Sequence, residues 1–461
     1  MIKSQSSARR GIVAATMAVA FYGAAPGALE AQDSNSQNQS APAPQTTNIV
    51  STPQNQRFNW HVQNTDIVQA DPGFSSKYSG PASLSSGGET RETVSLDLFL
   101  GLRLWTGAEF HVDGLVWQGF GLSKTEGIEA FPNGEAYRLG TKVPNIALAR
   151  AFIRQTFNLG GESESIPDDQ LTLAGKQDIS RITITLGELS TIDVFDNNTY
   201  AHDPRTQFMN WALVGNEAWD YPADSIGYTS GITIELNQPK WALRYGFFQV
   251  PRVSNGMAID GRYFVAWGMV TELERRWAIK NHPGVIRLLT YLNEAHMGSY
   301  EDALSASGLD ITQSRADRVK YGFCLNWEQE IITNIGLFSR VGWSDGHTEA
   351  WMYSDVDQSA SAGTSIKGGF WHRPNDTVGL AGVINGISRE HKEFLEAGGV
   401  GILAGDGALN YGLERTMETY YDCAILENLH ASLDYQLVIN PAFNKDRGPV
   451  SIFGARLHWE Y

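Results

Sequence analysis

The chain has 461 residues, of which 19% are charged and 11% aromatic, with 47 glycines and a formal net charge of −16 at pH 7. This acidic balance argues against a nucleic-acid partner, which would need clustered Lys and Arg, and two cysteines exclude a disulfide scaffold. The mean hydropathy is −0.26, and no run reaches roughly 18 consecutive apolar residues, so a helical membrane protein is excluded. A membrane β-barrel remains open, because its signal per segment is much weaker.

The N-terminal residues predict export of the chain from the cytoplasm. Residues 1–31 have the layout of a cleaved secretory signal peptide, in which basic residues precede an apolar stretch and small residues lead to the cleavage site. Residues 32–56 are rich in Gln, Asn, Ser and Pro and are predicted to be a disordered lead-in. Residues 57–92 are predicted to form an N-terminal periplasmic segment that precedes the folded part.

A two-residue periodicity begins at residue 93 and predicts strands. In 94–105, six aliphatic side chains alternate with a second face that carries Asp97 and Arg103. After a Thr-Gly pair, a second run places Glu109, His111 and Asp113 on one face, and the short connection predicts a hairpin. Further candidate strands follow at 145–157, 181–189, 208–215, 226–237, 240–250, 262–279, 284–296, 319–330, 333–345, 352–369, 376–386, 411–426, 429–440 and 453–461.

These runs predict an all-β fold, a transmembrane antiparallel barrel of about 16 strands over residues 93–461 with a short N-terminal extension. A soluble sandwich of this size would be divided by linkers, and no Pro- or Ser-rich break interrupts the runs. Aromatic residues at run ends fit two interfacial girdles, namely Trp105, Trp117, Trp241, Trp277, Trp343, Trp459 and Tyr461. The terminal Tyr461 also resembles an outer-membrane assembly signal, the alternative being an ordinary C-terminal strand.

No motif predicts catalysis, a cofactor or a metal site. Ser344 has the spacing of a nucleophile elbow, but no helical pattern follows it. Residues 399–404 match a dinucleotide fingerprint without the preceding strand that this fingerprint requires. The spacing of Asp193, Asp196 and Asp203 does not fit a calcium loop, so solvated loop carboxylates are expected, although a bound calcium ion remains an open alternative.

Several long sequence segments are more specific than the alternation that all membrane barrels share. The chain resembles the carbohydrate-selective porins of Gram-negative outer membranes in residues 60–84, 128–139, 195–213, 398–422 and 434–458. The resemblance covers roughly residues 58–461 and implies a 16-stranded barrel, often trimeric, that passes sugars such as glucose by facilitated diffusion. One departure is Val112-Asp113-Gly114, where family members often carry an Asn-Pro-Glu-like element.

A channel for uncharged sugars needs hydroxyl acceptors, hydroxyl donors and aromatic faces in a wet lumen. The predicted lumen residues are Asp97, Arg103, Glu109, His111 and Asp113 on the first hairpin, Asp203, Arg205, Asn210 and Trp211 on an inward loop, and Glu414, Glu418, Asp434, Gln436 and Asn440 near the end. The expected partners are mono- or oligosaccharides, outer-membrane lipid and lipopolysaccharide, the barrel assembly machinery and a homotrimeric copy. The alternatives are a soluble exported β-rich sugar-binding protein and a general diffusion porin.

Overall fold

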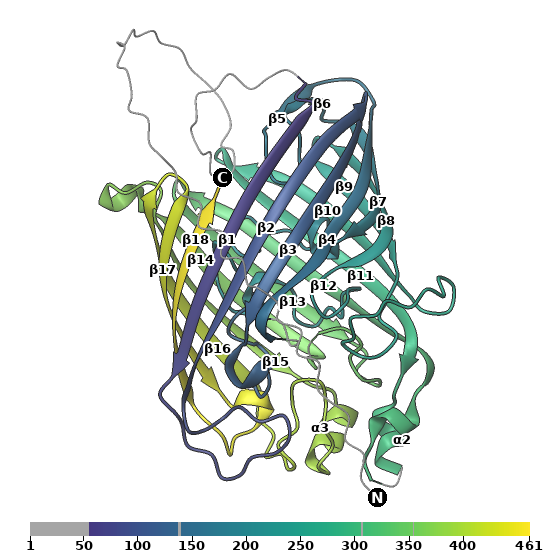
Figure 1. Cartoon of the computed structure of the whole chain (residues 1–461), viewed down its shortest axis with the longest axis vertical. Helices are drawn as coiled ribbons and strands as arrows, with labels where there is room; N and C mark the ends of the chain where they lie inside the picture. The colour runs from purple at the N-terminus through teal and green to yellow at the C-terminus, as the bar shows by residue number, and fades with distance from the viewer. Residues whose placement is uncertain (1–54, 137–139, 306–307, 354) are drawn as a thin grey trace, which may run out of the picture. The chain divides into compact units, whose positions relative to one another are not determined.

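The computed structural model describes residues 55–136, 140–305, 308–353 and 355–461. Within these ranges, 16 strands form one closed antiparallel barrel (Figure 1). Each strand pairs with its neighbour along the chain, and the first strand pairs with the last. The predicted signal peptide, and the predicted lead-in up to residue 54, lie outside the described residues.

The strand bounds follow the predicted runs closely. The barrel contains β1 Phe58–Asp71, β2 Glu89–Trp105, β3 Ala108–Gly119, β4 Thr141–Asn158, β7 Arg181–Leu189, β8 Thr229–Gln238, β9 Trp241–Phe248, β10 Trp267–Ile279, β11 His282–Met297, β12 Ala316–Ile332, β13 Ile335–Ser344, β14 Gln358–Lys367, β15 Thr377–Gly386, β16 Glu414–Leu426, β17 Leu429–Ile439 and β18 Val450–Glu460. A separate two-stranded sheet pairs β5 Ser163–Ile166 with β6 Gly175–Asp178. The helices are α1 Trp211–Val214, α2 Tyr300–Ser305 and α3 Arg389–Glu396.

Two of the sequence-based strand assignments are wrong, and they offset each other in the strand count. Residues 58–71 were expected in a periplasmic segment but form β1, which pairs with both β2 and β18. The outward face of β1 carries Asn64 and Asp66 among its apolar residues, so its alternation is weak. The candidate strand at 208–215 is instead a loop with the one-turn helix α1, because its apolar residues pack inside the barrel.

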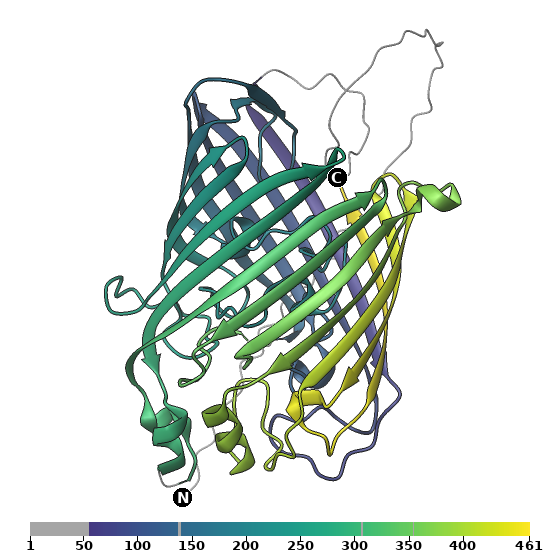
Figure 2. The ribbon, with the colours of Figure 1, turned by 180° about the vertical axis from the view of Figure 1, so that it is seen from behind.

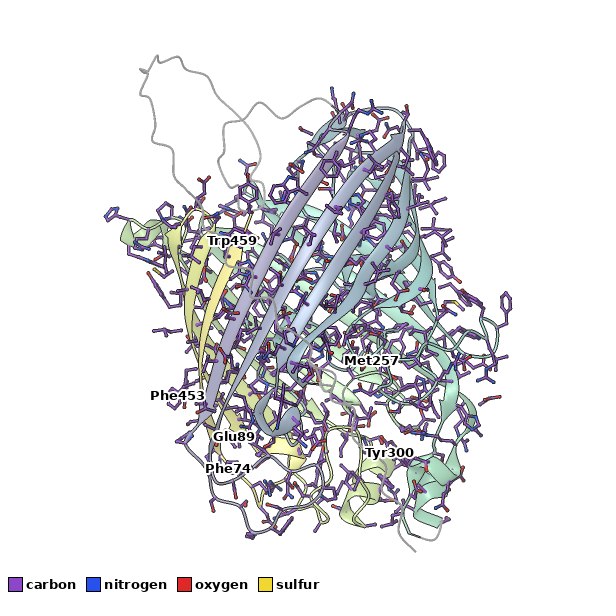
Figure 3. All side chains as sticks on the ribbon, viewed as in Figure 1. Phe74, Glu89, Met257, Tyr300, Phe453 and Trp459 are labelled. Atoms are coloured by element: carbon purple, nitrogen blue, oxygen red, sulfur yellow. The ribbon has the colours of Figure 1, made fainter. Side chains whose placement is uncertain are left out.

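The two faces of the wall have opposite chemistry, as the alternation predicts. The outward face of β2 is apolar, with Leu98 45% exposed, whereas the inward Asp97 is fully buried. On β18, Phe453 and Trp459 lie on the outward face toward opposite ends of the strand (Figure 3). Trp117 was expected in a girdle but faces inward and is buried. No helix within the described ranges is long and apolar enough to cross a membrane.

The two ends of the barrel differ in their connections. Five two-residue turns, at 106–107, 239–240, 280–281, 333–334 and 427–428, lie at the end where the chain terminates. Apart from the connections 159–180 and 368–376, which lie at the same end as these turns, the longer connections, including those with α2 and α3, lie at the opposite end (Figures 1 and 2). Outer-membrane barrels keep short turns on the periplasmic side and long loops outside. The connection between β1 and β2 therefore lies at the extracellular end, which further corrects the periplasmic assignment of 57–92.

Two of the connections that fold into the barrel are long and contribute to its core. The segment between β3 and β4, called the β3–β4 loop, spans residues 120–140, and the β7–β8 loop spans residues 190–228. Phe208 of the β7–β8 loop is fully buried and packs with Phe338 of β13 and Tyr420 of β16. These loops narrow the lumen and place side chains in it.

Candidate channel constriction

The inward loops border an open space of about 730 Å³ inside the barrel, a volume that includes the adjoining solvent. Its lining combines residues of the β3–β4 loop, the β7–β8 loop and the barrel wall with Asn255, Tyr353 and Leu403 from three other connections. The side chains that define its chemistry are Phe131, Glu135, Arg150, Arg205, Trp211, Tyr221, Tyr228 and Tyr353.

One side of the space is aromatic. Trp211 stacks on Phe131, with ring centroids 5.3 Å apart and an interplanar angle of 11°. Tyr353 lies 5.6 Å from Trp211 and stacks on Tyr221 at 4.6 Å. Rings in such contact hold one another in place and present a continuous apolar surface.

Trp211 is positioned by the turn that precedes it. Asn210 caps α1 by accepting the N–H of Ala212, and its amide donates to the backbone of Ala130 and to Gln436 on β17. The apolar residues of α1 are buried beneath it. A buried amide with several partners allows few alternative positions, so the Trp211 ring is held at the edge of the space.

The other side of the space is ionic. Arg205 lies 3.2 Å from Glu135 and 3.8 Å from Asp97 on β2. Burial raises the pKa of the Glu135 carboxyl above its ordinary value, although the adjacent Arg205 opposes this rise. The pair presents a donor and an acceptor within one hydroxyl's reach of each other.

Arg150 of β4 makes a second ionic arrangement on this side. Its guanidinium donates to Asp113 of β3 at 2.7 Å and to both oxygens of Asp193 at 2.7 Å. The Tyr228 ring lies 5.1 Å from the same guanidinium. Asp193 and Asp196 are thus occupied by cations of the protein, since Asp196 pairs with Arg340, and no metal-binding cluster exists in the described part of the chain.

Several predicted lumen residues point inward but serve as anchors for the inward loops. Glu414 accepts the N–H groups of Glu129 and Ala130, and Glu418 accepts those of Met209 and Asn210. Gln436 donates to the backbone of the β3–β4 loop and to Asp434. The loops cover all four of these wall side chains, because buried N–H groups at the loop turns require acceptors.

The remaining predicted residues fall in three places. Glu109 lies 3.1 Å from Arg103 and 3.2 Å from His111, nearer the periplasmic end of the wall. Asp203 accepts the N–H of Arg205 and shapes its turn. Asn440 is wrongly placed by the strand pattern: it follows β17 in a left-handed conformation and donates to the backbone of Leu413.

Of these eight constriction residues, only Arg205 and Trp211 were predicted from the sequence, and six were missed. Glu135 and Phe131 lie in a segment without alternation, so only the family resemblance drew attention to it. Arg150 lies beside a register shift in the pairing of β3 with β4. Strict alternation along the sequence therefore does not assign its side chain to the correct face of the strand. Tyr221 and Tyr353 belong to loops whose path into the barrel has no local signal.

A closed barrel with an apolar outer wall and a constriction built by inward loops defines a diffusion channel of the outer-membrane porin class. The structure of Pseudomonas putida OprB at high pH is similar, with a TM-score of 0.67 and 16% identity over 88% of this chain and 94% of that one. The low-pH structure of that protein has a TM-score of 0.49 and 12% identity over 88% and 93% of the two chains. At such identities the likeness is one of fold.

The family model described as carbohydrate-selective porin, OprB family, matches residues 82–461. The chain belongs to this family, and it is an outer-membrane porin for carbohydrates. No curated protein matches the chain.

Proposed function

We propose that a sugar crosses the barrel between the aromatic side of the constriction and its ionic side. The observation that carries this proposal is that Trp211 and Arg205 line the same space. A pyranose ring has apolar faces that suit an aromatic surface, and its hydroxyls both donate and accept. Arg205 supplies hydrogen-bond donors and Glu135 supplies an acceptor. A sugar hydroxyl can therefore replace its hydrogen bonds to water by hydrogen bonds to the protein without a large energy barrier.

Binding at this place must be weak for transport. Trp211 supplies contact area, while Arg205 and Arg150 are already bound to carboxylates. Donors that share their charge with a fixed partner offer only modest hydrogen bonds to a neutral solute. The sugar then remains mobile, as conduction requires binding that is favourable for access and weak enough for release.

The experiment compares sugar uptake in liposomes that contain the wild-type porin, Trp211→Ala or Trp211→Phe. We expect the alanine variant to lose the preference for hexoses over uncharged, non-sugar solutes of equal size, and the phenylalanine variant to retain part of it. Trp105→Ala is the matched control, because Trp105 is 60% exposed on the outer wall. An unchanged hexose preference in Trp211→Ala would instead favour a general diffusion porin.

We further infer that residues 1–31 are removed as a signal peptide, that the channel is not an enzyme, and that it works without cofactor or metal. Lipopolysaccharide, the barrel assembly machinery and a homotrimer remain the proposed partners. N-terminal sequencing of the mature protein tests the cleavage site after Ala31. Cross-linking in intact membranes tests the trimer, which should give a product of three subunits. Recovery of the monomer alone would contradict it.

A further inference from the structure

One connection at the periplasmic end is unlike the others. The segment 159–180 between β4 and β7, here called the exit hairpin, contains β5 and β6, which pair from Ser163–Asp178 to Ile166–Gly175. It lies at the end where five of the other connections are two-residue turns and one, between β14 and β15, spans residues 368–376 (Figure 1). Porin barrels normally have short turns there, so the length of this connection needs a physical explanation.

The tip of the exit hairpin, residues 167–174, contacts the inner wall on β1. The Asn59 amide donates to the Asp168 carboxylate at 2.7 Å and to the backbone oxygens of Asp169 and Thr172 at 2.9 Å each. Asn59 itself is inward-facing and 4% exposed. A single wall amide with three acceptors fixes the path of the tip.

The tip also contacts β2 and β4. Arg154 of β4 donates to the backbone oxygen of Leu171 at 2.7 Å, and Arg103 of β2 donates to that of Ala174 at 3.3 Å. Leu173 and Ala174 are fully buried. The tip therefore occupies part of the lumen and does not lie on the rim.

The tip reaches the underside of the constriction. Leu171 packs against the cluster that contains Phe152, Trp219 and Tyr221, and Tyr221 lines the constriction itself. Asp168 and Asp169 remain exposed on the tip. A solute that leaves the constriction therefore meets a second protein element with two carboxylates before it reaches the periplasm.

We propose that the tip of the exit hairpin is a second selectivity filter, which narrows the periplasmic exit and disfavours anionic solutes. Its backbone is held by neutral and cationic wall donors, so the carboxylates of Asp168 and Asp169 add negative charge to a narrow passage. Coulomb repulsion across such a passage is stronger than in open water. The inference does not depend on which constriction residues touch the sugar.

The first test removes the hairpin. Asn158 and Arg181 are paired across the ladder, so an Asn-Gly turn can replace 159–180. We expect the folded variant, identified by heat-modifiable gel migration, to show a single-channel conductance raised by about 1.5-fold or more and to admit larger oligosaccharides. A folded variant with unchanged conductance and unchanged sugar size limit would overturn the proposal.

Point variants decide the matter if the shortened barrel does not fold. Asn59→Ala releases three contacts of the tip and should raise conductance fluctuations and the sugar size limit. Asp169→Asn should raise the permeability of chloride relative to potassium by about 1.5-fold, because a lumen carboxylate is removed. Glu162→Gln is the matched control, since Glu162 is an exposed carboxylate of the exit hairpin outside its tip. If Asn59→Ala leaves the conductance unchanged and Asp169→Asn matches Glu162→Gln, the proposal is wrong.

Discussion

Glu418 on the barrel wall accepts the backbone N–H of Asn210, the residue that precedes Trp211, at 2.9 Å. Its second oxygen accepts the N–H of Met209 at 2.6 Å. The two bonds hold the turn of the β7–β8 loop where its aromatic side chain faces the constriction. A wall carboxylate thus determines the position of a ring that belongs to a distant part of the chain.

Replacing this carboxylate should loosen the constriction without opening the barrel. In Glu418→Ala, two buried N–H groups lose their acceptor, each at a cost of about 1–3 kcal/mol. We expect a higher conductance, a weaker sugar preference and a lower thermal midpoint. Met417→Leu is the control, since Met417 is the adjacent outward residue on β16. Wild-type conductance in Glu418→Ala would show that the loop is held by other contacts.

The ionic side predicts a pH-dependent ion preference. Arg205→Gln removes a cation beside Glu135 and Asp97, so the ratio of potassium to chloride permeability should rise severalfold at pH 8. Without Arg205, the raised pKa of Glu135 should rise further. The Glu135 carboxyl is then protonated at a higher pH, so the gain in the permeability ratio should diminish as the pH falls. Reversal potentials across a salt gradient measure the ratio. Arg389→Gln, an equal charge change on the exposed face of α3, should leave it unchanged.

Acid should weaken the extracellular cap around α3. Burial opposes ionisation of Asp357, but Lys320 and His391 outweigh it and hold the pKa of this carboxyl below its ordinary value of 3.8. Its contribution to stability is therefore present above about pH 3.8 and is lost as the pH falls below that. The protection factors of the α3 amides, which correct for the pH dependence of the intrinsic exchange rate, should fall more between pH 4 and pH 2 in the wild type than in Asp357→Asn. Asp302→Asn, an exposed change on α2, should behave as the wild type.

The C-terminal aromatic residue should affect assembly more than stability. The Tyr461 ring lies 5.1 Å from Trp60 and is 63% exposed, so its removal costs little packing. If Tyr461 is the assembly signal, its deletion should slow the appearance of folded protein in the outer membrane, and Tyr461→Phe should restore the rate. Pulse-labelling followed by unboiled gel migration measures this rate. Equal rates in all three proteins would assign Tyr461 to an ordinary strand end.

The wall of the barrel was predictable from the sequence because alternation is a local property. Asp97 and the leucines beside it could be assigned to opposite faces from their order alone, and the structure agrees. β1 was missed because Asn64 and Asp66 interrupt its outward apolar face. Where both faces carry polar residues, period-two patterning has no contrast to detect.

The interior was predictable only in part. The family resemblance drew attention to Arg205 and Trp211, but alternation placed Glu414 and Glu418 in an open lumen. They are covered, because loops from elsewhere in the chain fold over them. Long-range packing of this kind produces no periodic pattern in the sequence. Tyr353 was not predicted for the same reason.

The pairing of β1 with β18 sets an order for biogenesis. Residues 63–70 bond to residues 453–460, so the seam that seals the cylinder joins the earliest and the latest strands to be translated. Until β18 arrives, β1 presents an unsatisfied edge that could recruit another polypeptide. Contacts this remote along the chain also form slowly. A copy interrupted anywhere before Val450 would therefore lack the strand that closes the cylinder, and β1 and β17 would each keep an unpaired edge.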